Sequence, residues 1–182
     1  MRMKRYVYKL LVLAALLLSS ACVNKDHLSD FHTQTSGVWS TVRHDVGLSY
    51  HDYRMQLRED LQALWEQRIA AGKVTHGEED AGLIAEAMTP ADGKSLCVET
   101  KGAVLLIHGL FDSPYVMNDL GGLFNQQCFD TRFVLLPYHG TQPGDLVVFS
   151  AAAWKATVAY ATDSLANDFS DQRLYIAGFS TA

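Results

Sequence analysis

A serine within a run of small residues is the feature of this sequence that most directly suggests chemistry. Ser180 lies in the stretch GFSTA, residues 178–182, directly after the apolar run LYIA at 174–177. This order predicts a strand that turns sharply into a helix, with the serine hydroxyl exposed on the turn. The turn strains the backbone, so small residues are needed two positions before and after the serine. Gly178 meets the first requirement, and Ala182 meets the second approximately, since glycine is usual there.

A serine hydroxyl attacks a carbonyl only when a base takes its proton and an acid orients that base. The oxyanion that forms also needs donors held in place beforehand. Two backbone N–H groups are the candidates here: Thr181, directly after the serine, and Leu110, in the loop after the apolar run at 103–107. Gly109 lets that loop approach closely, because no Cβ stands in the way. These residues predict acyl transfer to Ser180.

Hydrophobic periodicity predicts the elements that would position this chemistry. The continuous apolar run at 103–107 indicates a parallel strand covered on both faces, and residues 132–136 and 173–177 are expected to form two more strands. Helices are expected after Ser113 and over 151–167. Strand, helix, strand, helix, strand predicts an α/β fold with a doubly wound, mostly parallel sheet.

The two helices are each expected to bury one stripe of side chains against the sheet. In the helix after Ser113 that stripe should consist of Val116, Leu120, Leu123 and Phe124. In the second helix it should consist of Trp154, Val158, Ala161 and Leu165. Ligands of such sheets bind outside the carboxyl ends of the strands. His108 and Gly109, the run 138–140 and Ser180 all follow those ends, so a site is expected there.

Three motifs in this order resemble the α/β-hydrolase esterases and lipases. The run IHGLFDSPY at 107–115 looks like their oxyanion loop. LPYHGT at 136–141 with PGDL at 143–146 is similar to their Pro-Gly-His-Gly-Thr stretch, although Tyr138 stands where the family has glycine. The run GFST matches the serine turn that the family calls its nucleophile elbow. The resemblance covers residues 97–182 and implies an incomplete α/β-hydrolase fold.

The resemblance also implies a chain order of serine, then acid, then histidine. Both partners of Ser180 are therefore expected beyond residue 182, so that the sequence is the N-terminal part of the enzyme and inactive alone. His108 and His139 are expected to shape the site by hydrogen bonding, with His139 as the base left open as an alternative. Asp112 and Asp145 are expected to be turn or cap residues rather than the catalytic acid.

The function implied for the complete protein is a serine hydrolase of carboxylic esters that works through an acyl-enzyme at Ser180. A peptidase or amidase on the same fold is the first alternative, because the fold does not choose the leaving group. A non-catalytic scaffold protein of the envelope is the second. The expected partner is a small ester or a lipid-like substrate.

The N-terminal sequence predicts that the protein is localised in the bacterial cell envelope. Four cations precede an apolar core at 10–18 and small residues at 19–21, which is the pattern of a signal peptide over 1–21. Cys22 follows directly and is expected to carry a lipid that holds the protein on a membrane. Val23 after that cysteine resembles outer-membrane rather than inner-membrane lipoproteins. Plain secretion is the alternative.

Three segments are expected in the mature chain. Residues 22–50 are polar and without period, which predicts a tether, and residues 51–90 predict a helical prefix. Residues 91–182 are expected to be the N-terminal part of the hydrolase domain. Removal of the four signal-peptide cations changes the formal charge from −5 to −9, which argues against a nucleic-acid partner.

Cys97 and Cys128 remain once Cys22 is assigned to the lipid. An oxidising compartment and their expected positions at one edge of the sheet favour a disulfide, with two unpaired thiols as the alternative. The sequence shows neither the His-Glu-x-x-His spacing of a metal site nor a glycine-rich phosphate loop, so no metal and no cofactor are expected. The oligomeric state is left open.

Overall fold

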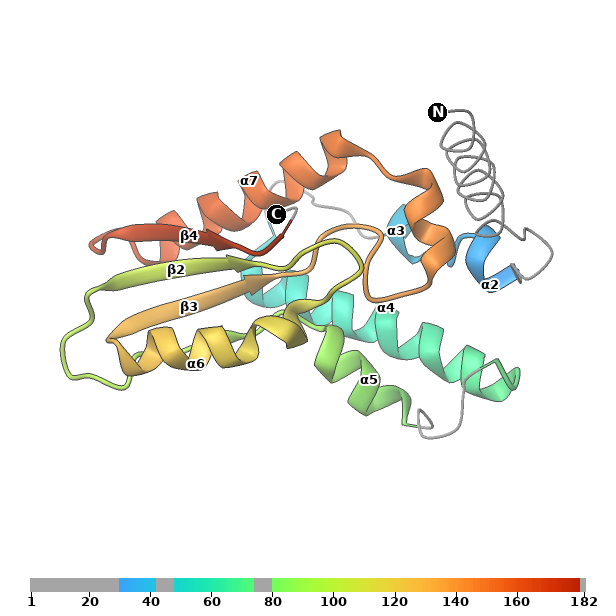
Figure 1. Ribbon diagram of the computed structural model, residues 1–182, viewed down its shortest axis with the longest axis horizontal. Helices are drawn as coiled ribbons and strands as arrows, with labels where there is room; N and C mark the ends of the chain where they lie inside the picture. The colour runs from blue at the N-terminus through green and yellow to red at the C-terminus, as the bar shows by residue number, and fades with distance from the viewer. Residues whose placement is uncertain (1–29, 42–47, 74–79, 181–182) are drawn as a thin grey trace, which may run out of the picture. The chain divides into compact units, whose positions relative to one another are not determined.

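Four strands form one sheet in the order β1-β3-β2-β4, and Figure 1 labels β3, β2 and β4 side by side. They are β1 (Asp92–Gly93), β2 (Gly102–Ile107), β3 (Phe129–Val134) and β4 (Leu174–Gly178). The central strand β2 pairs in parallel with β3 and β4, and the short β1 pairs antiparallel with β3. Ile107 aligns with both Val134 and Gly178, so three strands end at one edge. The α/β class and the mostly parallel sheet are confirmed.

This computed structural model describes residues 30–41, 48–73 and 80–180. The chain divides into two units, Met1–Asp30 and Phe31–Ala182. Nearly all of the described residues belong to the second unit. The expected signal peptide and Cys22 lie outside the described residues. No helix within the described ranges is long and apolar enough to cross a membrane.

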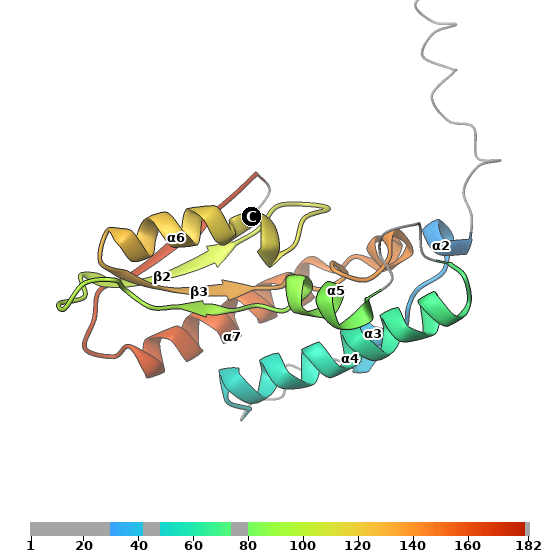
Figure 2. The same ribbon diagram turned by 90° about the horizontal axis from the view of Figure 1, so that it is seen from below.

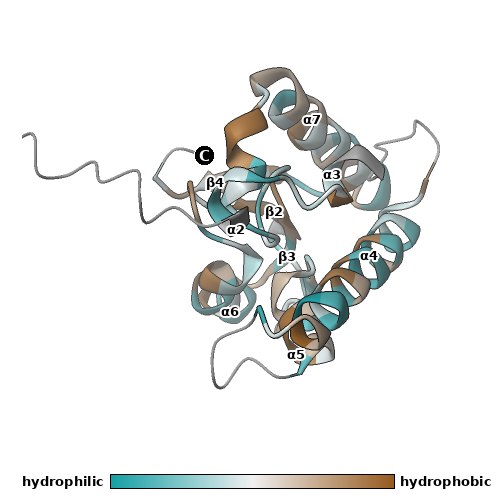
Figure 3. Cartoon of the chain, turned by 90° about the vertical axis from the view of Figure 1, so that its right-hand side faces the viewer, coloured by the Kyte–Doolittle hydropathy of each residue, from teal (hydrophilic) through white to brown (hydrophobic). Residues whose placement is uncertain are grey.

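Helices cover the sheet on both faces, as a doubly wound fold requires. The 3₁₀ turn η3 (Pro114–Met117) and α6 (Asn118–Gln126) lie on one face, and α7 (Ala151–Asp168) lies on the other (Figure 2). Viewed along the strands in Figure 3, α6 and α7 stand on opposite sides of β2. Alternate residues of β2 divide between the two layers: Ala103, Leu105 and Ile107 pack with α7, and Val104 and Leu106 with Met117 and Phe133.

The expected stripe of α7 is confirmed, because Ala161 and Leu165 are buried with Trp154 and Val158 packed beside them. The stripe expected in the helix after Ser113 was wrong at three of its four positions, because Val116, Leu120 and Leu123 are exposed. Phe124 packs against the core as expected, and the buried residues are Met117 of η3 and Gly121 of α6.

Two local features rotate the helix. The first turn is 3₁₀, with three residues per turn, and the side chain of Ser113 makes no capping hydrogen bond. The ring of Phe133 lies directly under Gly121, where an added Cβ would stand 2.5 Å from its Cζ. The helix therefore presents its glycine to the sheet.

The helical prefix is confirmed as α4 (Tyr50–Ala70) and α5 (Ala81–Met88). The hydroxyl of Ser49 caps α4 by accepting from the backbone of Asp52 at 3.1 Å. One face of α4 packs on α5 and on the chain just after β3, in a cluster formed by Tyr50, Tyr53, Leu57, Leu61, Ala85 and Leu135. Leu64 and Trp65, further along α4, are only half-buried. The prefix is therefore fastened to the carboxyl edge of the sheet.

The expected tether is wrong over residues 34–39, which follow α2 (Asp30–Thr33), enter α3 (Val38–Thr41) and pack on the body of the protein. Ser36 hydrogen-bonds to the carboxylate of Asp145 at 2.6 Å through both its backbone N–H and its hydroxyl. Val38 is buried. Single polar contacts and two adjacent apolar side chains, Val38 and Trp39, hold this segment, and hydrophobic periodicity cannot detect contacts of that kind.

A disulfide joins Cys97 and Cys128, the pair named from the sequence. Cys97 precedes β2, and Cys128 directly precedes β3. The backbone of Lys101 donates to the carbonyl of Cys128 at 2.7 Å. The bond therefore lies at the amino ends of the strands, at the opposite end of the sheet from Ser180.

Candidate active site at the carboxyl edge of the sheet

Ser180 lies at the edge where the three parallel strands end. The backbone N–H of Phe179 donates to the carbonyl of Ile107 at 3.0 Å, which continues the pairing of β4 with β2 by one residue. Ser180 follows with φ 59°, in the left-handed region that residues with a Cβ rarely adopt. Its side chain is exposed. The chain thus stops pairing and turns sharply at the serine.

The loop after β2 packs directly on this turn. A Cβ added to Gly109 would lie 2.9 Å from Cβ of Ser180 and 3.0 Å from the carbonyl oxygen of Phe179. The loop is closed by a bond of 3.3 Å from the N–H of Asp112 to the carbonyl of Gly109. Phe111 within it has φ 64°. Glycine at position 109 is therefore required for the loop and the serine turn to meet.

The structure describes only one of the two expected oxyanion donors. Leu110 is on the loop that meets the serine turn, between Gly109 and the left-handed Phe111, and its side chain is exposed. Thr181 lies outside the described residues, as does Ala182. Gly178 is the last residue of β4, paired with Ile107. The role of the two amides remains a proposal.

His108 ties the ends of two strands together. Its Nε2 accepts from the backbone N–H of Leu136 at 3.0 Å, so its Nδ1 carries the proton and donates to the carbonyl of Gly109 at 2.8 Å. Burial lowers the pKa of His108 to about 4, although the bond to Gly109 opposes the shift. Its ring is neutral at neutral pH with both nitrogens engaged, and it cannot take a proton from Ser180.

His139 is buried beside His108, with ring centroids 5.0 Å apart, and it also packs on Trp154. Its Nδ1 is bonded to the carbonyl of Pro137 at 2.9 Å. Burial lowers its pKa, and its Nε2 has no partner among the described residues. No histidine in the described ranges hydrogen-bonds to Ser180. These contacts favour a shaping role for His139.

Tyr138 shows why the resembling motif has glycine at this position. Its φ is 72°, and that of Gly140, two residues on, is also 72°. The left-handed region costs a residue with a Cβ about 1–2 kcal/mol, whereas glycine adopts it freely. The tyrosine therefore keeps the loop conformation that glycine favours, and its ring lies 6.2 Å from that of Trp39.

The sequence did not reveal that Asp145 is at the centre of a buried polar network. Its carboxylate accepts from Ser36 and from the hydroxyl of Thr141. Arg68, buried near the end of α4, donates to the carbonyl of Thr141 at 3.2 Å and to the side chain of Gln142. Asp145 was expected to be a turn or cap residue, and nothing in the sequence links it to residues more than 70 positions away.

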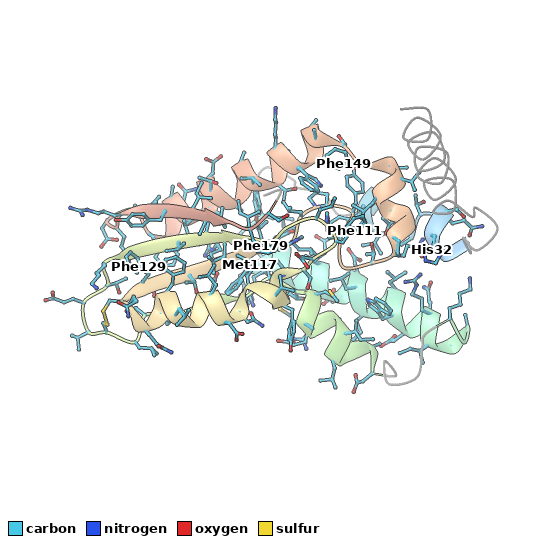
Figure 4. All side chains as sticks on the ribbon, viewed as in Figure 1. His32, Phe111, Met117, Phe129, Phe149 and Phe179 are labelled. Atoms are coloured by element: carbon cyan, nitrogen blue, oxygen red, sulfur yellow. A yellow bond between two sulfur atoms is a disulfide. The ribbon has the colours of Figure 1, made fainter. Side chains whose placement is uncertain are left out.

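Two cavities flank the loop after β2. One, of about 300 Å³, is enclosed by residues 111–113, residues 138–143 and the prefix side chains Trp65 and Met88. The other, of about 430 Å³, is lined by Leu110, Phe111, Leu146, Phe149 and Trp154 and is almost wholly apolar. Phe111 belongs to both and is labelled with Phe149 in Figure 4. Among the residues that the structure places, no group of three or more His, Cys, Asp or Glu side chains could hold a metal ion.

No protein-family model matches the chain, and no curated protein is similar to it. Among solved structures, 27 chains are similar. One of them comes from work on LipS and LipT, two metagenome-derived lipolytic enzymes, and it matches with 24% identity and a TM-score of 0.45. The match covers 52% of this chain and 36% of that one, so this chain spans about a third of its length. Lipolysis is a property of that enzyme and is not transferred here on so partial a match.

Proposed function

We propose that Ser180 is the nucleophile of a serine hydrolase that acts on carboxylic esters. The observation that carries this proposal is the left-handed Ser180 at the end of β4, packed against Gly109 of the neighbouring loop. An exposed hydroxyl on a strained turn, at the carboxyl edge of a parallel sheet, is the arrangement that acyl transfer uses.

The reaction would proceed in two halves. Oγ of Ser180 attacks the ester carbonyl carbon while a histidine takes its proton, and the carbonyl oxygen becomes an oxyanion held by the N–H groups of Leu110 and Thr181. The C–O bond to the alcohol breaks, and the histidine returns the proton to the leaving alcohol. Water then attacks the acyl-enzyme by the same route and releases the acid and free Ser180. The resemblance places this histidine and its acid after Ser180 in chain order.

The two cavities beside the loop support an ester with an apolar group as the substrate. Both have a largely hydrophobic lining, and the larger is built from leucine, phenylalanine and tryptophan side chains. Burial of apolar surface contributes about 25 cal/mol per Å², so a hydrocarbon chain gains more here than a charged group.

A fluorophosphonate probe tests the proposal on the longest product of the gene. We expect covalent labelling at Ser180, lost in Ser180→Ala and retained in Ser170→Ala, an exposed serine in the turn after α7. A folded product that never reacts would favour the non-catalytic scaffold and refute the proposal. Faster cleavage of a nitroanilide than of the matching nitrophenyl ester would favour the amidase.

We further propose that the protein is held on the envelope by a lipid on Cys22. The support is the sequence pattern at residues 1–22. Growth with an alkyne-tagged fatty acid should label the wild type and leave Cys22→Ser unlabelled. Equal labelling of the two would contradict the anchor.

A further inference from the structure

We propose that Asp145 is a positioning residue that fastens the N-terminal segment 34–39 to the loop 137–146 and so fixes one wall of the cavity of about 300 Å³, which the loop after β2 also lines. The segment is then part of the site's architecture rather than a connection to the envelope. Only the kinetic part of the test below rests on the proposed function.

The first support is the carboxylate of Asp145, which is 1% exposed. Its Oδ1 accepts from the backbone N–H of Ser36, and its Oδ2 accepts from the hydroxyls of Ser36 and Thr141. A buried carboxylate is costly unless donors surround it, and bonds to a charged acceptor are about twice as strong as neutral ones. Two chain segments 109 residues apart are thereby joined through one side chain.

The second support is the close seating of the segment on the loop. Nε1 of Trp39 donates to the hydroxyl of Thr141 at 3.1 Å, and the side chain of Gln142 donates to the carbonyl of Gln34 at 2.5 Å. A Cβ on Gly144 would stand 1.9 Å from that same carbonyl oxygen. Glycine is needed here because the two backbones touch. These contacts join the same two segments that Asp145 joins, the segment 34–39 and the loop 137–146.

The third support is what the loop encloses. Residues 138–143 and Leu146 line the cavity of about 300 Å³, and Asp145 lies between them. Phe111 and Asp112 also line it, on the loop whose Gly109 contacts Ser180. Release of Asp145 would therefore move one wall of the cavity and leave the serine turn in place.

The test compares Asp145→Asn with Asp130→Asn in the full-length protein. Asp130 is a matched control because it is also buried and also bonds a backbone N–H, that of Ser95 at 2.9 Å, but it lies at the amino end of β3. We expect amide hydrogen exchange in Asp145→Asn to accelerate at least tenfold over 34–41 and 137–146 and to remain unchanged over 95–101. Asp130→Asn should show the reverse. Wild-type protection of 34–41 and 137–146 in Asp145→Asn would overturn the proposal.

The kinetic readout separates positioning from general damage. For an ester that fills the cavity, KM should rise about tenfold in Asp145→Asn while kcat stays within about twofold, because the wall moves and Ser180 does not. Ser36→Ala is a milder change than Asp145→Asn because it removes only one of the hydrogen bonds to the Asp145 carboxylate, that from the Ser36 hydroxyl. It should raise KM by a smaller factor. A fall in kcat that equals the rise in KM would overturn the positioning role. If even the wild type fails to label at Ser180, the proposed function fails, and hydrogen exchange still decides the role of Asp145.

Discussion

Replacement of Gly109 by alanine tests the geometry at Ser180 most directly. The new methyl group would lie 2.9 Å from Cβ of Ser180, 3.0 Å from the carbonyl oxygen of Phe179 and 3.3 Å from Oδ2 of Asp112. The backbone of Gly109 is outside the left-handed region, so alanine can adopt its conformation and only the added volume matters. The perturbation is therefore a small wedge between the loop and the serine turn.

The magnitude follows from these distances. Carbon atoms reach ordinary contact at about 3.5 Å, so the turn must move by about half an ångström. The crowded atoms are a backbone carbonyl and a Cβ, which no rotamer change can displace. We expect the free energy of unfolding to fall by about 1–2 kcal/mol, at the lower end for overpacking because β4 is an edge strand. Labelling of Ser180 by a fluorophosphonate should slow by about tenfold to a hundredfold, because the serine would move away from the proposed oxyanion donors.

Two neighbouring glycines of α6 provide the controls. At Gly121 an added methyl would stand 2.5 Å from Cζ of Phe133, whereas at Gly122 nothing lies within 4 Å. Gly121→Ala should lower the free energy of unfolding by about 1–3 kcal/mol, and Gly122→Ala should raise it by up to about 1 kcal/mol through helix propensity. Urea unfolding measures these changes. Neither variant should alter the rate at which Ser180 is labelled.

The comparison has two outcomes that count against the reasoning. If Gly109→Ala is destabilised but labels at the wild-type rate, the close approach of the loop does not prepare Ser180. If Gly121→Ala slows labelling as much as Gly109→Ala does, lost stability explains both results, and the methyl group added at position 109 has no specific effect on Ser180.

The buried histidine predicts a pH dependence of stability, because the folded state keeps His108 neutral with a pKa of about 4 while the unfolded chain has about 6.5. Between these values the unfolded state binds more protons than the folded state. The free energy of unfolding should therefore fall by roughly 3 kcal/mol as pH drops from about 6.5 to 4, and the full contribution of the neutral His108 to stability should be present above about pH 6.5. Burial lowers the pKa of His139 as well. Urea titrations at several pH values should show that the free energy of unfolding of His108→Asn depends less on pH than that of the wild type. An unchanged dependence would contradict the assignment of this effect to His108. Reduction of the disulfide, whose cysteines are 31 residues apart, should cost about 3–4 kcal/mol in the chain-entropy model while the labelling of Ser180 stays unchanged, since the bond lies at the opposite end of the sheet. Slower labelling of the reduced but folded protein would show that the two ends of the sheet are coupled.

The parts of the fold that were predictable are those that repeat along the chain. The apolar run at 103–107 is buried on both faces because helices lie on both sides of β2, so a simple composition signal was sufficient. The small residues around Ser180 indicated a strained turn, and its φ of 59° agrees with that expectation. His108 was expected to shape its loop, and its two hydrogen bonds agree with that role.

The parts that were missed depend on contacts between distant segments. Three of the four stripe residues expected in the helix after Ser113 were wrong because the 3₁₀ turn changes the phase of the helix and because the ring of Phe133 takes the space where a Cβ at position 121 would lie. The segment 34–39 was assigned to a tether because its polar residues show no period. Its bonds to Asp145 and Thr141 are single, long-range and polar, and no sequence window contains both partners.

The contact between Gly144 and the carbonyl of Gln34 has a practical consequence for anyone who produces this protein. A recombinant version that starts near Cys22 retains the segment 34–39, whose side chains and backbone reach the 137–146 loop. A version trimmed to the first long helix, at Tyr50, exposes the Asp145 carboxylate to solvent and leaves Trp39 and Ser36 behind. Trimming of that kind, usually harmless at a terminus, would here reshape the cavity of about 300 Å³, and an inactive product would then report on the cloning boundary rather than on the proposed function.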